Sequence, residues 1–185
     1  VDEKSWKKYL NYVKRLCKKD NVEHFMQYVS LDSFGSQAEY IRHGLNFNLL
    51  WDRVNQFLTE IPGRNSITFI VTMNNLSVTG LGSLFAAILG LRHLYSNTYQ
   101  RIWFDTPVLR QPAWQSLQLL PESYADQLEL IWAWMIRQLE TEEAPFKGFK
   151  DYELARLDRD IAWMRDGQKL DPAYLNKNKA DFWKF

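Results

Sequence analysis

The stretch "SITFIVTM" (residues 66–73) decides the fold class of this chain. It is almost continuously apolar and rich in β-branched residues, and it follows the helix-breaking pair Pro62-Gly63. This pattern predicts a short strand that is buried on both faces, as in the interior of a parallel sheet.

Two further strands and several helices are expected around this strand. The other strand patterns are "HFMQYVSL" (24–31) and a part of "QRIWFDTPVL" (100–109). Apolar residues at helical spacing predict helices at residues 2–19, 48–61 and 79–95. We expect an irregular or extended piece at residues 114–121, two long helices after residue 122, and short helical turns in the polar tail.

Strands that alternate with amphipathic helices pair in parallel through crossover connections. The predicted fold class is therefore α/β: about three parallel βα units, which make either a partial (half) TIM-type barrel or a small open sheet, followed by C-terminal helices. Residues 1–121 would form the βα units, and residues 122–185 would form a helical segment packed on the same domain.

Bulk properties exclude several classes of function. The net charge of +1 gives no reason to expect binding to nucleic acid or to an anionic membrane. The longest apolar stretch, residues 81–95, is too short and interrupted for a membrane span and is expected to be a buried helix. We expect no signal peptide and, by default, a cytoplasmic protein.

Cys17 is the single cysteine of the sequence, so the chain forms neither an internal disulfide nor a site with several thiolates. The lysines beside it could lower its thiol pKa, although an incidental helix thiol is the simpler interpretation. His24, His43 and His93 have no metal-ligand spacing, and structural roles are expected for them.

The first candidate site residues follow the strand at 24–31. Ser30 and Asp32 alternate with apolar neighbours, so both point to one side of the strand end. Ligands of parallel sheets bind at the carboxyl ends of the strands, where a hydroxyl and a carboxylate would meet them together. The alternative is local: Asp32 or Ser33 caps the following turn or the helix at about 36–43.

Arg42 is the second candidate, because a guanidinium donates two parallel hydrogen bonds to a carboxylate or phosphate. The alternative is a surface ion pair with Glu39, three residues earlier on the same helical face. Gly35 and Gly44 are expected to serve backbone turns.

Polar residues also follow the other two strands. Thr72, Asn74 and Asn75 could hold polar ligand groups, but asparagine also commonly starts a turn. Asp105 and Thr106 could add a third carboxylate and a hydroxyl, although a helix cap or an Asx-turn is the simpler role. The sequence contains no glycine-rich phosphate loop, zincin helix or G-x-S-x-G elbow.

The stretch "QYVSLDSFGSQAEYIRHGLNFNLLWDRVNQFL" followed by "ITFIVTMNNLSV" resembles the radical S-adenosylmethionine (radical SAM) enzymes, in particular the branch with a SPASM or twitch extension. In that branch a mid-barrel strand ends in a Ser-x-Asp-Gly pattern and an "EYIR-x-G" segment follows. "SLQLLP" and "FKDYELARLDRDIAWM" also look like the region after the barrel in twitch-type members. The resemblance covers most of residues 24–166.

This resemblance implies an S-adenosyl-L-methionine pocket at the strand ends. Ser30 and Asp32 would line the pocket, Arg42 would bind the methionyl carboxylate, and Thr72 and Asn74 would lie near the ribose or the substrate. Ser33 stands where the family has glycine after the acid, so the turn there is expected to differ.

The family's CxxxCxxC motif, which binds a [4Fe–4S] cluster, is missing, as are the auxiliary-cluster cysteines. The resemblance therefore implies the C-terminal half of a partial barrel, with the cluster ligands and the N-terminal half outside this sequence. In the whole enzyme the cluster would cleave S-adenosylmethionine reductively to a 5′-deoxyadenosyl radical. We expect residues 1–185 alone to be inactive and to bind the cofactor weakly.

Two other interpretations of the sequence stay open. The chain could be a non-catalytic α/β module that binds a partner protein, since a half barrel leaves sheet edges and an apolar face uncovered. It could also be an unrelated nucleotide- or sugar-binding α/β enzyme that uses the same strand ends. The sequence does not identify the substrate, which could be a peptide or another small molecule.

Overall fold

A computed structural model describes residues 2–18 and 22–184 as an α/β arrangement with three parallel strands. The strands are β1 (Met26–Ser30), β2 (Ser66–Ile70) and β3 (Ile102–Asp105), in the spatial order β1-β2-β3. All pairs are parallel, with Tyr28 opposite Thr68 and Thr68 opposite Trp103. The α/β class and the parallel pairing predicted from the sequence are confirmed.

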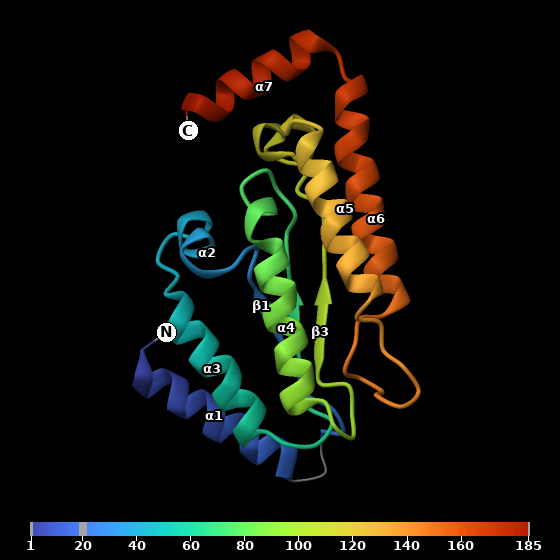
Figure 1. Ribbon diagram of the computed structural model, residues 1–185. Coiled ribbons are helices and arrows are strands. Elements are labelled where there is room, and N and C mark those ends of the chain that lie inside the picture. Colours follow the sequence, from blue (N-terminus) through green and yellow to red (C-terminus); the bar gives the residue numbers. More distant parts are fainter. Residues whose placement is uncertain (1, 19–21, 185) are drawn as a thin grey trace.

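Helices lie on one face of this sheet and beside β3 (Figure 1). Before and between the strands, the chain forms α1 (Glu3–Lys18), α2 (Gly35–Ile41), α3 (Phe47–Glu60), a 3₁₀ turn (Val78–Gly80) and α4 (Leu81–Tyr95). After β3 it forms 3₁₀ turns at Ala113–Gln115 and Leu117–Leu119, then α5 (Ser123–Ile136), α6 (Asp151–Asp166), a 3₁₀ turn (Gly167–Lys169) and α7 (Pro172–Lys184). The tail therefore ends in a 13-residue helix, where short helical turns were expected.

The main core lies between the sheet and helices α3 and α4. Phe69 of β2 stacks on Trp51 of α3 at 6.0 Å, and Phe104 of β3 stacks on Phe85 of α4 at 4.9 Å. Phe69 and Phe85 are completely buried. Aromatic pairs of this kind add to the free energy gained by burying apolar area.

The opposite face of the sheet is only partly covered. Tyr28 is 60% exposed, and Thr68, Ile70 and Trp103 on the same face are half-buried. The apolar run at 66–73 predicted burial of this strand on both faces, and this prediction is confirmed only in part, because Thr68 and Ile70 are half-buried. Alternation of Thr68 and Ile70 with Ile67 and Phe69 is the physical reason, since successive side chains point to opposite faces.

Helix α4 is long and apolar enough to cross a membrane by length and composition alone, together with the 3₁₀ turn before it (Val78–Tyr95). In this fold its apolar side chains are used in the core: Leu84, Phe85 and Ile88 are fully buried. Helix α4 is therefore a core helix, as the sequence predicted for residues 81–95.

Candidate functional site at the carboxyl ends of the strands

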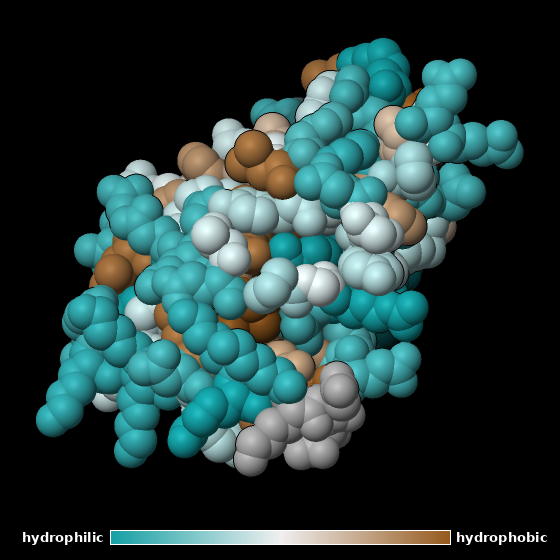
Figure 2. Space-filling view, turned by 90° about the horizontal axis from the view of Figure 1, so that it is seen from below, coloured by the Kyte–Doolittle hydropathy of each residue, from teal (hydrophilic) through white to brown (hydrophobic). Residues whose placement is uncertain are grey.

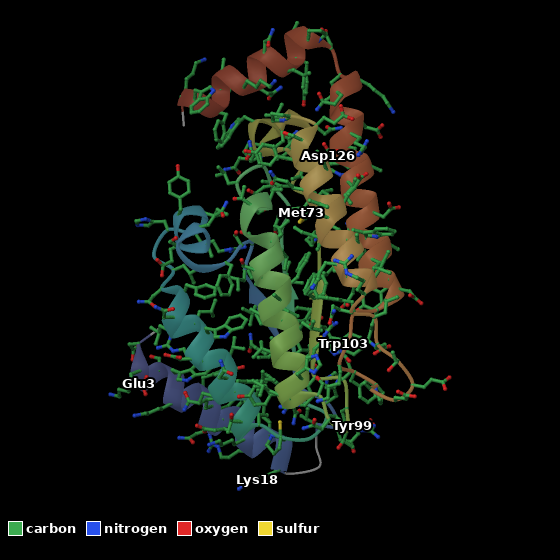
Figure 3. All side chains as sticks on the ribbon, in the orientation of Figure 1. Glu3, Lys18, Met73, Tyr99, Trp103 and Asp126 are labelled. Atoms are coloured by element: carbon green, nitrogen blue, oxygen red, sulfur yellow. The ribbon has the colours of Figure 1, made fainter. Side chains whose placement is uncertain are left out.

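Because the three strands are parallel, the segments that follow them lie at one end of the sheet, which we call the mouth. Met73, which follows β2, lies near this end, whereas Tyr99 and Lys18 lie at the opposite end (Figure 3). That opposite end is mainly hydrophilic, with hydrophobic side chains showing only between the polar ones (Figure 2). The mouth is where ligands of parallel sheets bind.

Asp32 is the centre of the polar contacts at the mouth. Its side chain is almost fully buried, and its Oδ1 accepts hydrogen bonds from the backbone N–H of Thr72 and from Nη2 of Arg42, both at 3.0 Å. Arg42 Nε lies 2.9 Å from the second carboxylate oxygen. A buried carboxylate is stable only when it is paired and hydrogen-bonded, and here both conditions are met. Asp32 therefore links the end of β1 to the end of β2 and fixes Arg42 between them.

Neither sequence-based alternative for Asp32 and Arg42 describes this geometry. Asp32 bonds to the neighbouring strand end and does not cap helix α2, whose N-cap residue has no side-chain capping bond. Glu39 does not pair with Arg42, because its Oε1 accepts from the N–H of Phe47 at the start of α3 at 2.7 Å. Arg42 stands at the C-cap of α2, close to Gly44, whose φ of 80° explains why glycine is needed there.

Arg42 keeps donor capacity for a ligand. Its side chain is 36% exposed, and the described residues give Nη1 no partner. A guanidinium held on one side by a buried carboxylate and open on the other can receive a second carboxylate without losing its first partner.

The other sequence-predicted residues contribute less. Ser30 is exposed at the rim of the mouth, without a side-chain hydrogen bond among the described residues. Thr72 is half-buried and joins the network through its backbone N–H. Asn74 is buried, and its amide is used locally: Nδ2 donates to the Thr72 carbonyl at 3.0 Å and Oδ1 accepts from the Leu76 N–H at 2.9 Å. The geometry of Asn74 is that of the turn alternative.

Ser33 is part of a tight contact between α2 and the segment before α4. It is fully buried, and its Oγ donates to the Ser77 carbonyl at 3.2 Å. A Cβ atom at Gly80 would lie 2.0 Å from this oxygen, so a side chain at position 80 would displace Ser33. Ser33 is thus accommodated, because Gly80 opposite it has no side chain.

A second polar cluster lies at the end of β3, and the sequence analysis found only half of it. Asp105 pairs with Arg156 of α6 at 2.5 Å, and Arg159 donates to the Thr106 carbonyl at 2.6 Å and to Asp160 at 2.7 Å. Asp160 is fully buried, and this burial raises the pKa of its carboxyl above the ordinary value. The run "LARLDRD" was a usable signal, because its two arginines recur three residues apart on one helical face.

Cys17 and His24 lie away from the mouth. Burial raises the pKa of the Cys17 thiol, so the expectation that neighbouring lysines could lower it is wrong. His24 contacts the Ser66 hydroxyl at 2.8 Å, at the opposite end of the sheet. In residues 2–18 and 22–184, no three His, Cys, Asp or Glu side chains form a group that could hold a metal ion.

Asp32, Arg42 and the backbone of Thr72 are thus the residues that the fold brings together, and Ser30 lies beside them at the end of β1. No family model, curated protein or solved structure matches this chain.

Proposed function

We propose that this chain is the C-terminal portion of a radical SAM enzyme and that its mouth binds the methionyl end of S-adenosylmethionine. One observation carries the proposal: Asp32, Arg42 and Thr72 meet at the carboxyl ends of two adjacent parallel strands. Arg42 is 36% exposed there, so it can bind a carboxylate.

The residues present suit one part of this cofactor. A methionyl carboxylate would bind Arg42, with Asp32 holding the guanidinium in place and the exposed Ser30 hydroxyl offering a further hydrogen bond. Asp32 would act as a positioning residue, since both of its oxygens already contact Arg42. The cofactor and a [4Fe–4S] cluster would together supply the radical chemistry, and one cysteine cannot hold that cluster.

Binding can be tested with residues 1–185 alone by NMR titration of the backbone amides with S-adenosylmethionine. We expect weak binding, with a Kd on the order of 1 mM, and chemical-shift changes centred on Asp32, Arg42 and Thr72. Arg42→Gln should weaken binding about tenfold, because a charge-assisted hydrogen-bond pair is lost. Arg64→Gln is the matched control, since Arg64 is exposed and precedes β2 at the opposite end of the sheet.

Two results would contradict the proposal. One is an affinity for S-adenosylmethionine that Arg42→Gln leaves unchanged; the other is formation of 5′-deoxyadenosine by this chain without an added cluster-binding half. Adenosine, which lacks the methionyl group, should bind equally to both variants. Tighter binding of ATP than of S-adenosylmethionine at the mouth would instead favour an unrelated nucleotide-binding enzyme.

The second candidate function is a protein-interaction module. The specific observation in its favour is the partly uncovered sheet face, where Tyr28 is 60% exposed. The two functions are compatible, because a half barrel must bind its other half before the cofactor site is complete.

A further inference from the structure

The outer edge of β1 has free hydrogen-bonding groups. The bonds Ser66 N–H to Phe25 C=O (2.9 Å) and Leu31 N–H to Ile70 C=O (3.0 Å) fix which residues of β1 face β2. Backbone groups alternate along a strand, so those of Met26, Tyr28 and Ser30 face away from β2. In the part of the chain that the structure describes, β2 is the one strand that pairs with β1. Of the outward groups, the Tyr28 carbonyl accepts a bond of 2.6 Å from the side chain of Gln27.

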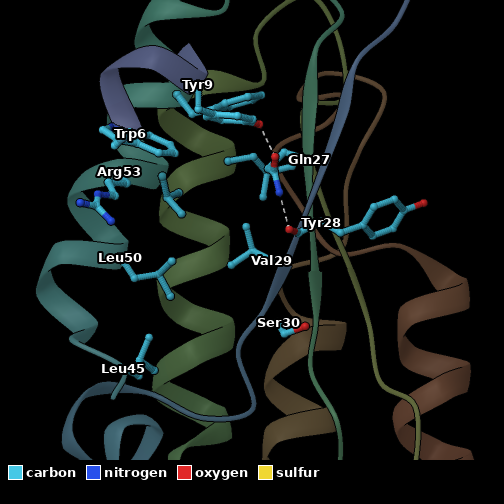
Figure 4. A pocket seen from close by; sticks show the side chains of 12 residues that line it. Trp6, Tyr9, Gln27, Tyr28, Val29, Ser30, Leu45, Leu50 and Arg53 are labelled. Atoms are coloured by element: carbon cyan, nitrogen blue, oxygen red, sulfur yellow. Dashed lines mark hydrogen bonds between the residues drawn. The ribbon is translucent and has the colours of Figure 1, made fainter. Parts of the chain in front are cut away.

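A cavity of about 460 Å³ lies directly beside this edge. Helix α1 contributes Trp6 and Tyr9, helix α3 contributes Leu50 and Arg53, and β1 contributes Val29 (Figure 4). Its lining is mainly apolar. Val29 points into it, whereas Tyr28 points to the other side of the strand (Figure 4). A strand placed beside β1 would therefore direct every second side chain into this cavity.

Helix α1 explains why the cavity exists. Helices α3 and α4 pack on strands, as the Trp51–Phe69 and Phe85–Phe104 contacts show. Helix α1 lies beyond α3 (Figure 1), and the hydroxyl of its Tyr9 donates to the side chain of Gln27 on β1 (Figure 4). It packs on α3, with Arg53 over the Trp6 ring at 5.4 Å, and the cavity is the space under it. In a βα unit, the strand that precedes the helix occupies this place.

The direction of such a strand follows from α1. Lys18, at the end of α1, lies near the end of the sheet opposite the mouth, and Glu3, at its start, lies closer to the mouth (Figure 3). A strand that continues into α1 must therefore arrive at the mouth, and so it runs parallel to β1. Parallel strands joined through a helix are the ordinary βαβ unit.

We propose that the outer edge of β1 and this cavity together bind a β-strand that runs parallel to β1 and places an apolar side chain in the cavity at every second position. The source of this strand, the cluster-binding half of the enzyme, rests on the proposed function. The geometry of the binding surface does not depend on it.

The test is a designed strand grafted before Asp2: seven residues alternating valine and threonine, joined by a short Gly/Ser linker. Amide hydrogen exchange, measured by NMR, should slow about tenfold or more at Tyr28 and Ser30 relative to the ungrafted chain. Gln27 and Val29, whose N–H groups face β2, are internal controls and should change little.

Two control variants separate strand pairing from other effects. Tyr28→Pro removes an outward N–H and leaves the ladder to β2 intact, so the graft should no longer protect Ser30. A graft of alternating serine and threonine has no apolar residue for the cavity and should protect less than the valine graft.

Unchanged exchange at Tyr28 and Ser30 in a folded, valine-grafted chain would overturn the proposal. Concentration-dependent protection of these amides in the ungrafted chain would also overturn it, in favour of pairing between two copies. Neither variant alters Arg42, so the S-adenosylmethionine titration reports separately on the proposed function.

Discussion

The two edges of the same three-stranded sheet are built very differently. We call the outer edge of β3 closed, because helices α5 and α6 lie beside it (Figure 1). Its Ile102 carbonyl, which faces away from β2, also accepts from Arg92 at 3.2 Å and from Gln100 at 2.5 Å. Among residues 2–18 and 22–184, Gln27 is the one side chain that bonds to a backbone group at the outer edge of β1, and a cavity lies beside this edge. Proteins normally protect strand edges from pairing. The difference indicates that this sheet ends at β3 and can be extended at β1.

The closed edge depends on one buried ion pair. Arg92 of α4 and Glu153 of α6 are both fully buried, and their two contacts measure 2.5 and 2.9 Å. Arg92 also donates to the Gly148 carbonyl at 2.7 Å and lies over the ring of Phe104. These contacts hold α6 and the loop before it against β3.

The largest expected effect comes from breaking this pair. Glu153→Gln should lower the free energy of unfolding by about 3–5 kcal/mol, because the Arg92 guanidinium would stay buried without its counter-charge. Urea denaturation monitored by circular dichroism measures the change. Glu143→Gln, on the exposed loop before α6, is the control and should have almost no effect. A loss below 1 kcal/mol for Glu153→Gln would mean that this ion pair does not hold the edge closed.

Replacement of both Arg92 and Glu153 separates the cost of the unpaired charge from the loss of the other contacts of Arg92. Arg92→Met combined with Glu153→Met should recover a large part of the lost stability, because no unpaired charge remains in the core. If the double variant is as unstable as Glu153→Gln, the hydrogen bonds of Arg92 to the two backbone carbonyls are the more important contacts.

Sequence patterns predicted the framework of the fold because the framework depends on local periodicity. The three strands, helices α3 and α4 and the parallel pairing follow from apolar residues at spacings of two and of three to four. The closed edge could not be predicted in this way, since Arg92 and Glu153 are 61 residues apart and each looks like an ordinary helix-surface residue. Only the packing of α6 against β3 brings them together.

At the candidate site, too, local patterns predicted the positions of residues but not their contacts. The sequence predicted that Asp32 and Arg42 lie near one another at the strand ends, and the structure has them in contact. The contact itself could not be predicted, because Arg42 follows a short helix whose path is not encoded in a periodic pattern. Asn74 was a further candidate in the sequence, with a turn as the alternative. Its amide forms the turn instead, since asparagine bonds readily to backbone groups two residues away.

An intermediate change in stability, which depends on pH, is expected when Asp160 of α6 is replaced by asparagine. Burial raises the pKa of Asp160 in the folded state, whereas the unfolded value is about 3.9. Its contribution to stability is therefore fully present below the unfolded pKa and is lost as pH rises through the folded pKa. Asp160→Asn removes this loss, so the variant should gain stability relative to the original chain between about pH 4 and pH 7.

Urea denaturation at several pH values measures this gain. Asp158→Asn is the matched control, because Asp158 is exposed on the same helix, and its difference from the original chain should not grow with pH in the same way. A constant difference between the Asp160 variant and the original chain across this range would show that the Asp160 carboxyl titrates alike in both states.

The smallest change in the free energy of unfolding is expected for a substitution on β1, the strand at the open edge. Tyr28 is 60% exposed on β1, and threonine is as suited to a strand as tyrosine. Tyr28→Thr should change the free energy of unfolding by less than about 0.5 kcal/mol, against several kcal/mol for Glu153→Gln at the other edge. Urea denaturation of residues 1–185 makes this comparison directly. A loss above 1 kcal/mol would mean that Tyr28 is already packed against a second copy or another segment, in which case the two edges would not differ as described.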